Sequence, residues 1–526
     1  MIKGALRAIC VGLAAGTFSG PAPGQIAVSP APAAGSTQIP SGESTGLRAW
    51  RFKPLLSVAQ TYSDNVTLAP ANLARHDWVT TVTPGIHAEG SGARVRGVFD
   101  YRLSSSTYAN ASQLKNRQNF LSSRMTAELI ENQFFLEARA NISQQAKSAF
   151  SASAADASVA TANRVETSVY QLAPYWRGRI SDIAVYRIRL NVTQSSSRGL
   201  ASSSTTTTEW LGGIRNASPS AKIGWALDGS ALTVNPGIAN SSQITRGRGS
   251  MIIELMPDLH ASVFEGFETT NFPGLGRTSA LTPGFGLAWA PSNRTQVAAI
   301  REKRVFGQAQ TLLLAHRMSR IAFRYDDSRE IAILPNLIAA TGPGSLNALM
   351  SDLLAANIPD PGLRSQAVNA RLEGQGQPSQ NSALGEFATN QIFLRRNRQL
   401  SVAANGTVNA VSLSWSLRDQ LAVGSVASSL DSFSVSPSIR QKTLRSSWVH
   451  RLSPRSSMTL SGSRLNTEGL SGSAAAANQT TINLLGTRQV GRGTFASLGV
   501  RHSNFESTVA GASRENAILG TLAIRF

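Results

Sequence analysis

The chain has 526 residues and a formal net charge of +20, yet only 15% of its residues are charged. Soluble proteins usually carry about 25% charged residues, so an ordinary set of soluble domains is not expected. No stretch after the N-terminal region reaches the ~18 apolar residues of a spanning helix, so a helical membrane protein is not expected. A hydrophobic content of 41% argues against a disordered chain. The single cysteine, Cys10, cannot form a disulfide scaffold.

The N-terminal region has the layout of a secretory signal peptide. Lys3 and Arg7 form a basic start, residues 8–15 form a short apolar run, and small residues with proline follow. We therefore predict a signal peptide over residues 1–24. Residues 25–49 are rich in Pro, Ala, Gly and Ser, which is typical of a flexible tether. Residues 50–526 remain as one predicted folded region.

Apolar and polar side chains alternate along much of this region. Val411, Leu413 and Trp415 are separated by Ser412 and Ser414, and the same period of two recurs in residues 94–103, 184–193 and 518–526. Successive side chains of a β-strand point to opposite faces, so each segment is predicted to be a strand with one apolar face. Both a soluble β-sandwich and a transmembrane β-barrel produce this pattern.

The lengths of the connections favour the barrel, in which short periplasmic turns alternate with longer outer loops. Short turn-forming sequences are predicted at residues 90–92, 131–132, 178–179, 217–219, 257–258, 291–294, 318, 405–406, 453–455 and 491–493. Longer Ser-, Ala-, Asn- and Gly-rich connections are predicted at residues 104–118, 146–165, 233–248 and 466–479, with the short connection 303–308 as an exception. We predict an all-β, antiparallel up-and-down transmembrane β-barrel of roughly 22 strands, within a range of about 16 to 24.

Most of the positive charge is arginine, since only seven of the 50 basic side chains are lysines. Many arginines occupy the polar positions of predicted strands, which would face the lumen if the apolar positions face lipid. The predicted lumen-facing set is Arg94, Arg96, Arg102, Arg124, Arg139, Arg187, Arg189, Arg320, Arg324, Arg418 and Arg501. Such a lining would favour anions. In the alternative interpretation the arginines pair with Asp100, Glu128, Glu137 and Asp326 and stiffen the wall.

The longest predicted connection, residues 328–386, is assigned to the outer side as a loop insertion. Within it, after the possible N-cap Ser345, apolar side chains recur at helical spacing. They are Leu346, Leu349, Met350, Leu353 and Leu354. A short amphipathic helix here would either constrict the lumen or pack on neighbouring loops.

The sequence lacks the motifs of catalysis and of metal binding. The six histidines show no metal-ligand spacing, and neither a Gly-x-Ser-x-Gly elbow nor a phosphate-binding glycine loop occurs. No catalytic, cofactor-binding or metal-ligating residue is predicted, and nucleic acid is not an expected partner. The terminal Phe526, with Ile524 and Leu522 on the same strand face, is the predicted barrel-assembly signal.

Several short segments resemble one family of outer-membrane barrels. They are Phe52-Lys53-Pro54, Tyr62-Ser63-Asp64-Asn65-Val66-Thr67-Leu68-Ala69-Pro70, Thr83-Pro84-Gly85, Leu287-Ala288-Trp289-Ala290-Pro291-Ser292, Arg304-Val305-Phe306-Gly307, Ala315-His316-Arg317, Ile358-Pro359-Asp360-Pro361 and Leu452-Ser453-Pro454-Arg455. In this order the chain resembles the β-barrel proteins associated with the PEP-CTERM/exosortase system, which accompany exopolysaccharide genes in Gram-negative bacteria. The resemblance implies an outer-membrane location and a link to polysaccharide production or export, without any binding residues.

The expected function is therefore that of a non-enzymatic outer-membrane barrel associated with exopolysaccharide production or export, as an anion-favouring conduit or an accessory. The alternative is a structural or adhesion-type barrel with a blocked lumen. Expected partners are outer-membrane lipid, the barrel-assembly machinery, an anionic polysaccharide and periplasmic export components. The expected location is the outer membrane of a Gram-negative bacterium, reached through the inner membrane by means of the signal peptide.

Overall fold

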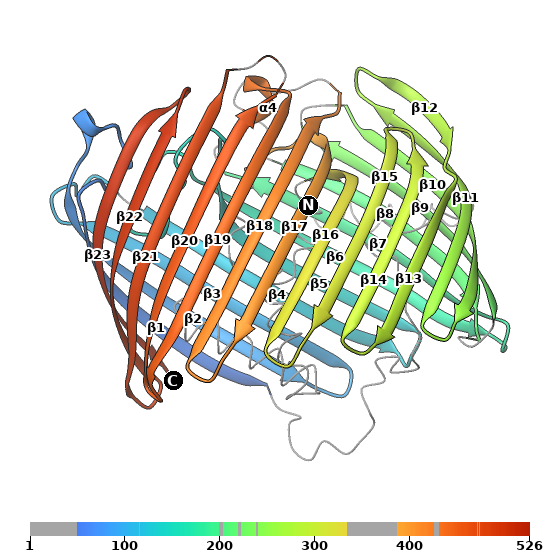
Figure 1. The fold of residues 1–526 in the computed structure, drawn as a ribbon, viewed down its shortest axis with the longest axis horizontal. Coiled ribbons are helices and arrows are strands. Elements are labelled where there is room, and N and C mark those ends of the chain that lie inside the picture. Colours follow the sequence, from blue (N-terminus) through green and yellow to red (C-terminus); the bar gives the residue numbers. More distant parts are fainter. Residues whose placement is uncertain are drawn as a thin grey trace, which may run out of the picture.

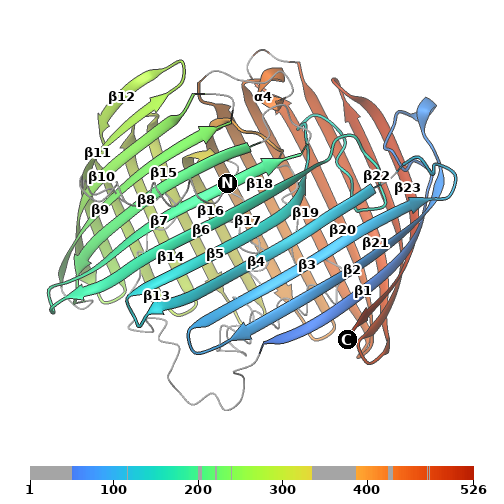
Figure 2. The same cartoon turned by 180° about the vertical axis from the view of Figure 1, so that it is seen from behind.

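The strands of this chain form one antiparallel sheet that closes on itself (Figures 1 and 2). The computed structural model describes residues 50–114, 116–198, 204–218, 222–237, 240–333, 387–424, 431–470, 472 and 474–526. The predicted signal peptide and tether, residues 1–49, lie outside these described residues, as does most of the predicted insertion.

The strands follow one another around the wall in chain order. The first half contains β1 (Arg51–Ser63), β2 (Asp77–Ser91), β3 (Val95–Tyr108), β4 (Asn116–Ile130), β5 (Phe134–Gln145), β6 (Val165–Ile180), β7 (Ala184–Ser197), β8 (Ser204–Asn216), β9 (Ile223–Pro236), β10 (Ser242–Met256) and β11 (Leu259–Phe272). The second half contains β12 (Gly276–Leu281), β13 (Gly284–Ser292), β14 (Thr295–Arg304), β15 (Gly307–Arg317), β16 (Ile321–Ile333), β17 (Ile392–Asn405), β18 (Asn409–Ala422), β19 (Ser438–Ser453), β20 (Ser456–Gly469), β21 (Ala476–Gly491), β22 (Thr494–Ser507) and β23 (Gly511–Arg525). The described helices are the short η1 (Ala71–Leu73) and α4 (Ser432–Val435), and no helix in the described ranges is long and apolar enough to cross a membrane.

The wall has 22 strand positions, which confirms the predicted barrel and its strand number. The barrel closes where β1 pairs with β23, from Leu55 opposite Arg525 to Ser63 opposite Ala517. β12 and β13 both pair with β11 and together fill one position. Pro283 separates them because proline has no N–H to donate to the ladder.

Short turns lie at one end of the barrel and the longer connections at the other, which identifies the periplasmic and outer ends. All ten predicted short connections correspond to connections between strands at the periplasmic end. The position predicted at 178–179 is wrong, since β6 continues to Ile180 and the turn uses Ser181, whose φ is +47°. Gly178 instead makes room for the Tyr186 ring, because a Cβ there would lie 2.5 Å from the Tyr186 hydroxyl.

The outer ends of the strands extend further than the sequence pattern predicts. β9 runs to Pro236 and β10 starts at Ser242, so most of the connection predicted at 233–248 is strand. The connections predicted at 104–118 and 466–479 are shortened in the same way, and β16 runs to Ile333, beyond the predicted start of the insertion at residue 328. Small polar side chains are compatible with a strand where it rises above the lipid or faces the interior, so their abundance does not mark a loop. The tight outer turn between Arg304 and Gly307 matches the predicted exception.

The wall is apolar on its exposed face. On β18, Val411, Leu413 and Trp415 are 44%, 45% and 38% exposed, whereas Arg418 and Gln420 are 9% and 4% exposed. This reverses the distribution in soluble proteins, where large apolar side chains turn inward. A lipid environment accounts for it, so the described wall has the character of an outer-membrane barrel.

Replacing Leu413 by Arg should therefore destabilise the barrel in lipid by about 2–4 kcal/mol, because the new charge would face hydrocarbon. Ser412 is the matched control: it is the adjacent residue of β18, it points to the opposite face, and it pairs with Ala403 and Ser447. Ser412→Arg should have little effect. Urea unfolding in lipid vesicles, followed by tryptophan fluorescence, measures both variants. Equal losses of stability would contradict the assignment of the two faces.

Candidate pore lining and outer closure

The connection between β5 and β6 folds across the outer mouth of the barrel. We call residues 146–164 the crossing segment. At one place Ala149 N–H donates to Ser432 Oγ at 3.0 Å, in α4 between β18 and β19. At another, Ser153 and Gln479 of β21 exchange two hydrogen bonds of 2.9 and 2.7 Å. Because these partners lie far around the wall from β5 and β6, the segment must pass over the interior, and Figure 2 shows it in teal near the upper ends of β19 to β22.

The most strongly charged contact of the crossing segment is between Asp156 and Arg501 of β22, which form an ion pair. Arg501 also donates from Nη2 to Glu515 of β23 at 2.7 Å, and its side chain is 2% exposed. Burial raises the pKa of the Asp156 carboxyl, but Arg501 and the donors of Ser158 outweigh burial and hold the pKa below its ordinary value. The crossing segment is thus tied to the wall by a carboxylate that stays ionised.

Apolar side chains fill in around these polar contacts. Phe150 of the crossing segment, Phe393 of β17 and Phe433 of α4 belong to one buried cluster, with exposures of 0–1%. A second cluster joins Val234, Ile244 and Phe272, on β9 to β11, to Ile333 and Ile392 on β16 and β17. The first cluster includes the crossing segment, so apolar packing stabilises the closure in addition to the ion pair. The second connects distant parts of the wall itself.

The crossing segment also identifies the inner face of the wall. Ser106 and Tyr108 of β3 donate to Ala157 O and Ser158 O at 2.9 and 3.0 Å, so their side of β3 faces the interior. Paired residues on neighbouring strands share a face. Val98 lies on this side of β3 and pairs with Arg124 of β4, which pairs with Arg139 of β5. Arg139 pairs with Gln171 of β6, and Gln171 pairs with a residue of β7, so all of these side chains face the interior.

An excess of positive charge lies on this inner face of β4 to β7, near the periplasmic end. We call it the basic wall, and it consists of Arg124, Arg139, Arg177, Arg187 and Arg189, with the carboxylates of Glu137 and Glu128 on the same face. Glu137 accepts from Arg139 Nε at 2.7 Å and from Arg189 Nη1 at 2.8 Å, while Arg124 Nε remains 3.8 Å away. Two carboxylates cannot neutralise five guanidinium groups, so this wall attracts anions.

Two aromatic rings hold part of the basic wall in place. Phe135 of β5 and Tyr175 of β6 stack with ring centroids 4.9 Å apart and an interplanar angle of 8°. The Arg177 guanidinium carbon lies 4.5 Å from the Phe135 centroid, and that of Arg187 lies 4.6 Å from the Tyr175 centroid. Cation–π contacts of this length fix the guanidinium groups without neutralising their charge.

A second cluster of charged side chains on the wall has equal numbers of positive and negative charges. Three arginines and three carboxylates from β9, β10, β11 and β14 form it, and we call it the ion cluster: Arg246, Arg248, Arg304, Asp228, Glu268 and Glu302. Arg304 Nε donates to Glu268 at 3.0 Å, and these side chains are 3% and 0% exposed. Its charges cancel, and four of its six side chains are only 0–6% exposed, so the ion cluster is structural. The sequence prediction missed Arg246 and Arg248 because residues 233–248 were assigned to a loop.

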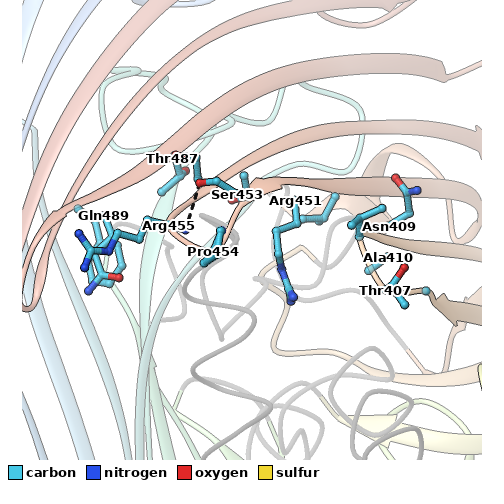
Figure 3. A pocket seen from close by; sticks show the side chains of 15 residues that line it. Thr407, Asn409, Ala410, Arg451, Ser453, Pro454, Arg455, Thr487 and Gln489 are labelled. Atoms are coloured by element: carbon cyan, nitrogen blue, oxygen red, sulfur yellow. Dashed lines mark hydrogen bonds between the residues drawn. The ribbon is translucent and has the colours of Figure 1, made fainter.

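A recess of about 210 Å³ opens among the periplasmic turns of β17 to β22 (Figure 3). Arg451 and Arg455 line it together with Thr487, Gln489 and Phe495. Figure 3 shows Arg455 beside Gln489 and Arg451 extended separately, and the Arg455 N–H donates to Ser453 Oγ at 3.2 Å. No acidic side chain is among the residues that line this recess, so positive charge occurs on this side of the periplasmic rim as well.

The predicted lumen-facing arginines have several environments. Arg94 and Arg320 lie in periplasmic turns outside the strands, contrary to the strand positions assigned to them, because the turns begin and end slightly differently from the prediction. Arg96 and Arg124 are exposed on β3 and β4, Arg187 is exposed on β7, and Arg418 is buried on β18. The remaining five take part in ion pairs: Arg102, Arg139, Arg189, Arg324 and Arg501.

The pairing interpretation applies to three of its four carboxylates. Asp100 pairs with Arg102 at 3.1 Å, Asp326 pairs with Arg324 at 2.8 Å, and Glu137 binds two arginines. Glu128 instead accepts the Asn132 N–H in a periplasmic turn. The arginines therefore divide into a paired group and an unpaired excess on the basic wall. Arg102, Arg139 and Arg324 pair within their own strands, whereas Arg189 and Arg501 pair with carboxylates of other strands.

Other predicted features are placed as follows. Phe526 is 73% exposed and its N–H donates to Pro54 O at 3.0 Å, and Leu522 and Ile524 pair with Val58 and Leu56 of β1. The helical stretch from Leu346 to Leu354, with its Ser345 cap, lies outside the described residues. In the ranges that the structure describes, no group of three or more His, Cys, Asp and Glu side chains could hold a metal ion.

No protein-family model matches the sequence, and no curated protein is similar to it in sequence. Structural similarity is to outer-membrane proteins. The FrpB iron transporter from Neisseria meningitidis aligns with a TM-score of 0.46 at 8% identity, over 90% of this chain and 81% of that one. The siderophore receptor PirA from Acinetobacter baumannii gives 0.44 at 8% identity, over 90% and 80%. OccAB1 from the same organism gives 0.34 at 10% identity, over 92% and 99%.

Proposed function

We propose that this chain is a non-enzymatic outer-membrane conduit for anions that serves exopolysaccharide production or export, and that the crossing segment closes its outer mouth. The basic wall carries this proposal, because five arginines with only two carboxylates on the same face create a field that favours anions in a low-dielectric enclosure. The link to polysaccharide is supported by the family resemblance of the segments from Phe52 to Arg455. Its proposed partners are outer-membrane lipid, the barrel-assembly machinery, which would read the segment ending at Phe526, an anionic polysaccharide and periplasmic export components.

One observation favours a second function, that of a structural or adhesion-type barrel with a blocked lumen. The crossing segment is held by hydrogen bonds, by an ion pair and by the apolar clusters that contain Phe150 and Ala152. Such packing would suit a permanent plug as well as a gate. The two functions differ in whether the lumen conducts once the crossing segment has been removed.

Planar-bilayer recordings of the native protein and two variants separate these functions. In one variant a Gly/Ser linker replaces residues 147–163, and in the control a linker replaces residues 508–510, the outer connection between β22 and β23. We expect the native protein and the control to conduct little, and the first variant to show a stable conductance that favours chloride over potassium. A cation-selective conductance would contradict the anion conduit, and silence of all three proteins would favour the blocked barrel.

A further inference from the structure

We propose that the stacked pair Phe135 and Tyr175, together with Arg177 and Arg187, forms a binding site for an acidic glycan, which it holds through the carboxylate groups of the sugar. This inference rests on the proposed conduit, since it names the substrate that the basic wall would guide. We call these four residues the arginine–aromatic site. They lie on three adjacent strands, β5 to β7, close to the periplasmic turns.

The first step of the argument is that the guanidinium groups are available. In the described part of the chain neither Arg177 nor Arg187 forms an ion pair, although both belong to an enclosed wall where arginines usually do. Arg177 donates from Nε to the Asn132 carbonyl at 3.3 Å, and both arginines are exposed. The two carboxylates on this face of β4 and β5 are already engaged, since Glu137 is bound by Arg139 and Arg189, and Glu128, opposite Phe135, accepts the Asn132 N–H. An anion from outside would therefore meet uncompensated donors.

The second step is that the donors are already oriented. Each guanidinium group lies over an aromatic ring, and the two rings are stacked on each other. A guanidinium group held by its face keeps its N–H edges in reach of a ligand, and such an edge matches a carboxylate in a two-point contact. In Arg177 this is the edge formed by the two Nη groups, because Nε donates to Asn132. Ordering two long side chains in advance also removes part of the entropy that binding would otherwise lose.

The third step concerns the size of the ligand. Arg124 of β4 adds a further exposed guanidinium group on the same inner face, so donors are spread over four neighbouring strands. A single small anion could contact only part of this surface, whereas a chain with repeated carboxylates could contact several donors at once. Repeated weak contacts on a single chain raise the overall affinity and still allow each contact to exchange. A glycan that carries a carboxylate on each sugar is a chain of this kind.

The test is isothermal titration calorimetry of the detergent-solubilised full chain with oligogalacturonate, at low salt. The methyl ester of the same oligomer removes the carboxylates, and inorganic tripolyphosphate supplies multiple charge without sugar. We expect binding of oligogalacturonate, much weaker binding of the ester, and weaker binding of tripolyphosphate. No binding of oligogalacturonate, equal binding of the ester, or tighter binding of tripolyphosphate would each overturn the glycan site.

Variants then locate the site. Arg177→Gln with Arg187→Gln should weaken oligogalacturonate binding by at least about tenfold, since each charged hydrogen bond contributes on that order. Tyr175→Leu keeps every charge but removes a ring, and we expect a weakening of about threefold to tenfold. The matched control is Arg451→Gln with Arg455→Gln, which removes the same charge from the recess and should change binding by less than about threefold.

Equal weakening by the control pair would show that net charge alone attracts the ligand, which would overturn the arginine–aromatic site. Each variant is checked for heat-modifiable migration on gels, so that an unfolded barrel is not mistaken for one that has lost its site. Ion selectivity in planar bilayers is measured separately. An anion-selective protein that does not bind oligogalacturonate would refute this inference and leave the proposed conduit intact.

Discussion

Replacing Glu268 by Gln is expected to lower the free energy of unfolding by about 3–5 kcal/mol, the largest effect of a single substitution that the structure predicts. Glu268 has no exposed surface and forms an ion pair with Arg304, whose side chain is 3% exposed. The Gln side chain has nearly the same shape as Glu but no charge. The Arg304 guanidinium would therefore remain buried away from water, at the same cost of desolvation, but would lose most of the electrostatic attraction that offsets this cost. Urea unfolding in lipid vesicles measures the change.

The matched control is Glu468→Gln. Glu468 accepts from Lys442 at 2.9 Å, but the two side chains are 41% and 46% exposed. Solvent screens such a pair, so its loss should cost less than about 1 kcal/mol. Similar small losses for both variants would show that the ion cluster behaves as an ordinary surface network and does not stabilise the wall.

The strands and their faces could be predicted from the sequence because lipid imposes a local rule. On β18 the residues from Val411 to Leu417 had to alternate, since one face meets hydrocarbon and the other does not. The turns followed from Gly, Pro, Asn and Ser at the strand ends for the same local reason. The error at residues 178–179 has a non-local cause, because Gly178 leaves space for the Tyr186 ring on the neighbouring strand instead of forming a turn.

The interior was much less predictable. The crossing segment is rich in Ser and Ala, and only its contacts with residues hundreds of positions away, such as Gln479 and Arg501, show that it folds inward. Phe150 and Val159 were the available signal, since large apolar side chains in a loop of small polar residues need a partner to bury them. Likewise, the position of Arg187 in the alternating pattern of its strand predicts that it faces the lumen. Its stacking on Tyr175 and its lack of an ion-pair partner among the described residues depend on the three-dimensional arrangement and could not be predicted.

Removing the Asp156 carboxylate should release the crossing segment without weakening the barrel wall. In Asp156→Ala, Arg501 keeps its bonds to Glu515 at 2.7 and 3.0 Å, so no buried charge is left alone. The segment loses a charged contact worth about 1.5–3 kcal/mol, a modest value because 40% of the Asp156 side chain is exposed. The fraction of time that the pore is open in planar bilayers should rise tenfold to a hundredfold or more, on the order of that energy.

Acidification of the native protein should act through the same carboxylate. Because the pKa of Asp156 is lowered, its contribution to closure is complete above its ordinary value of 3.8 and is lost only as the pH falls through the lowered pKa. Conductance should therefore stay low from neutral pH down to that value and rise below it, while Asp156→Ala should be open throughout. Asp182→Ala, in an exposed periplasmic turn, is the matched substitution and should behave like the native protein. A native protein that opens already near neutral pH, or an Asp156→Ala variant that remains closed, would mean that the apolar clusters hold the segment without help from the ion pair.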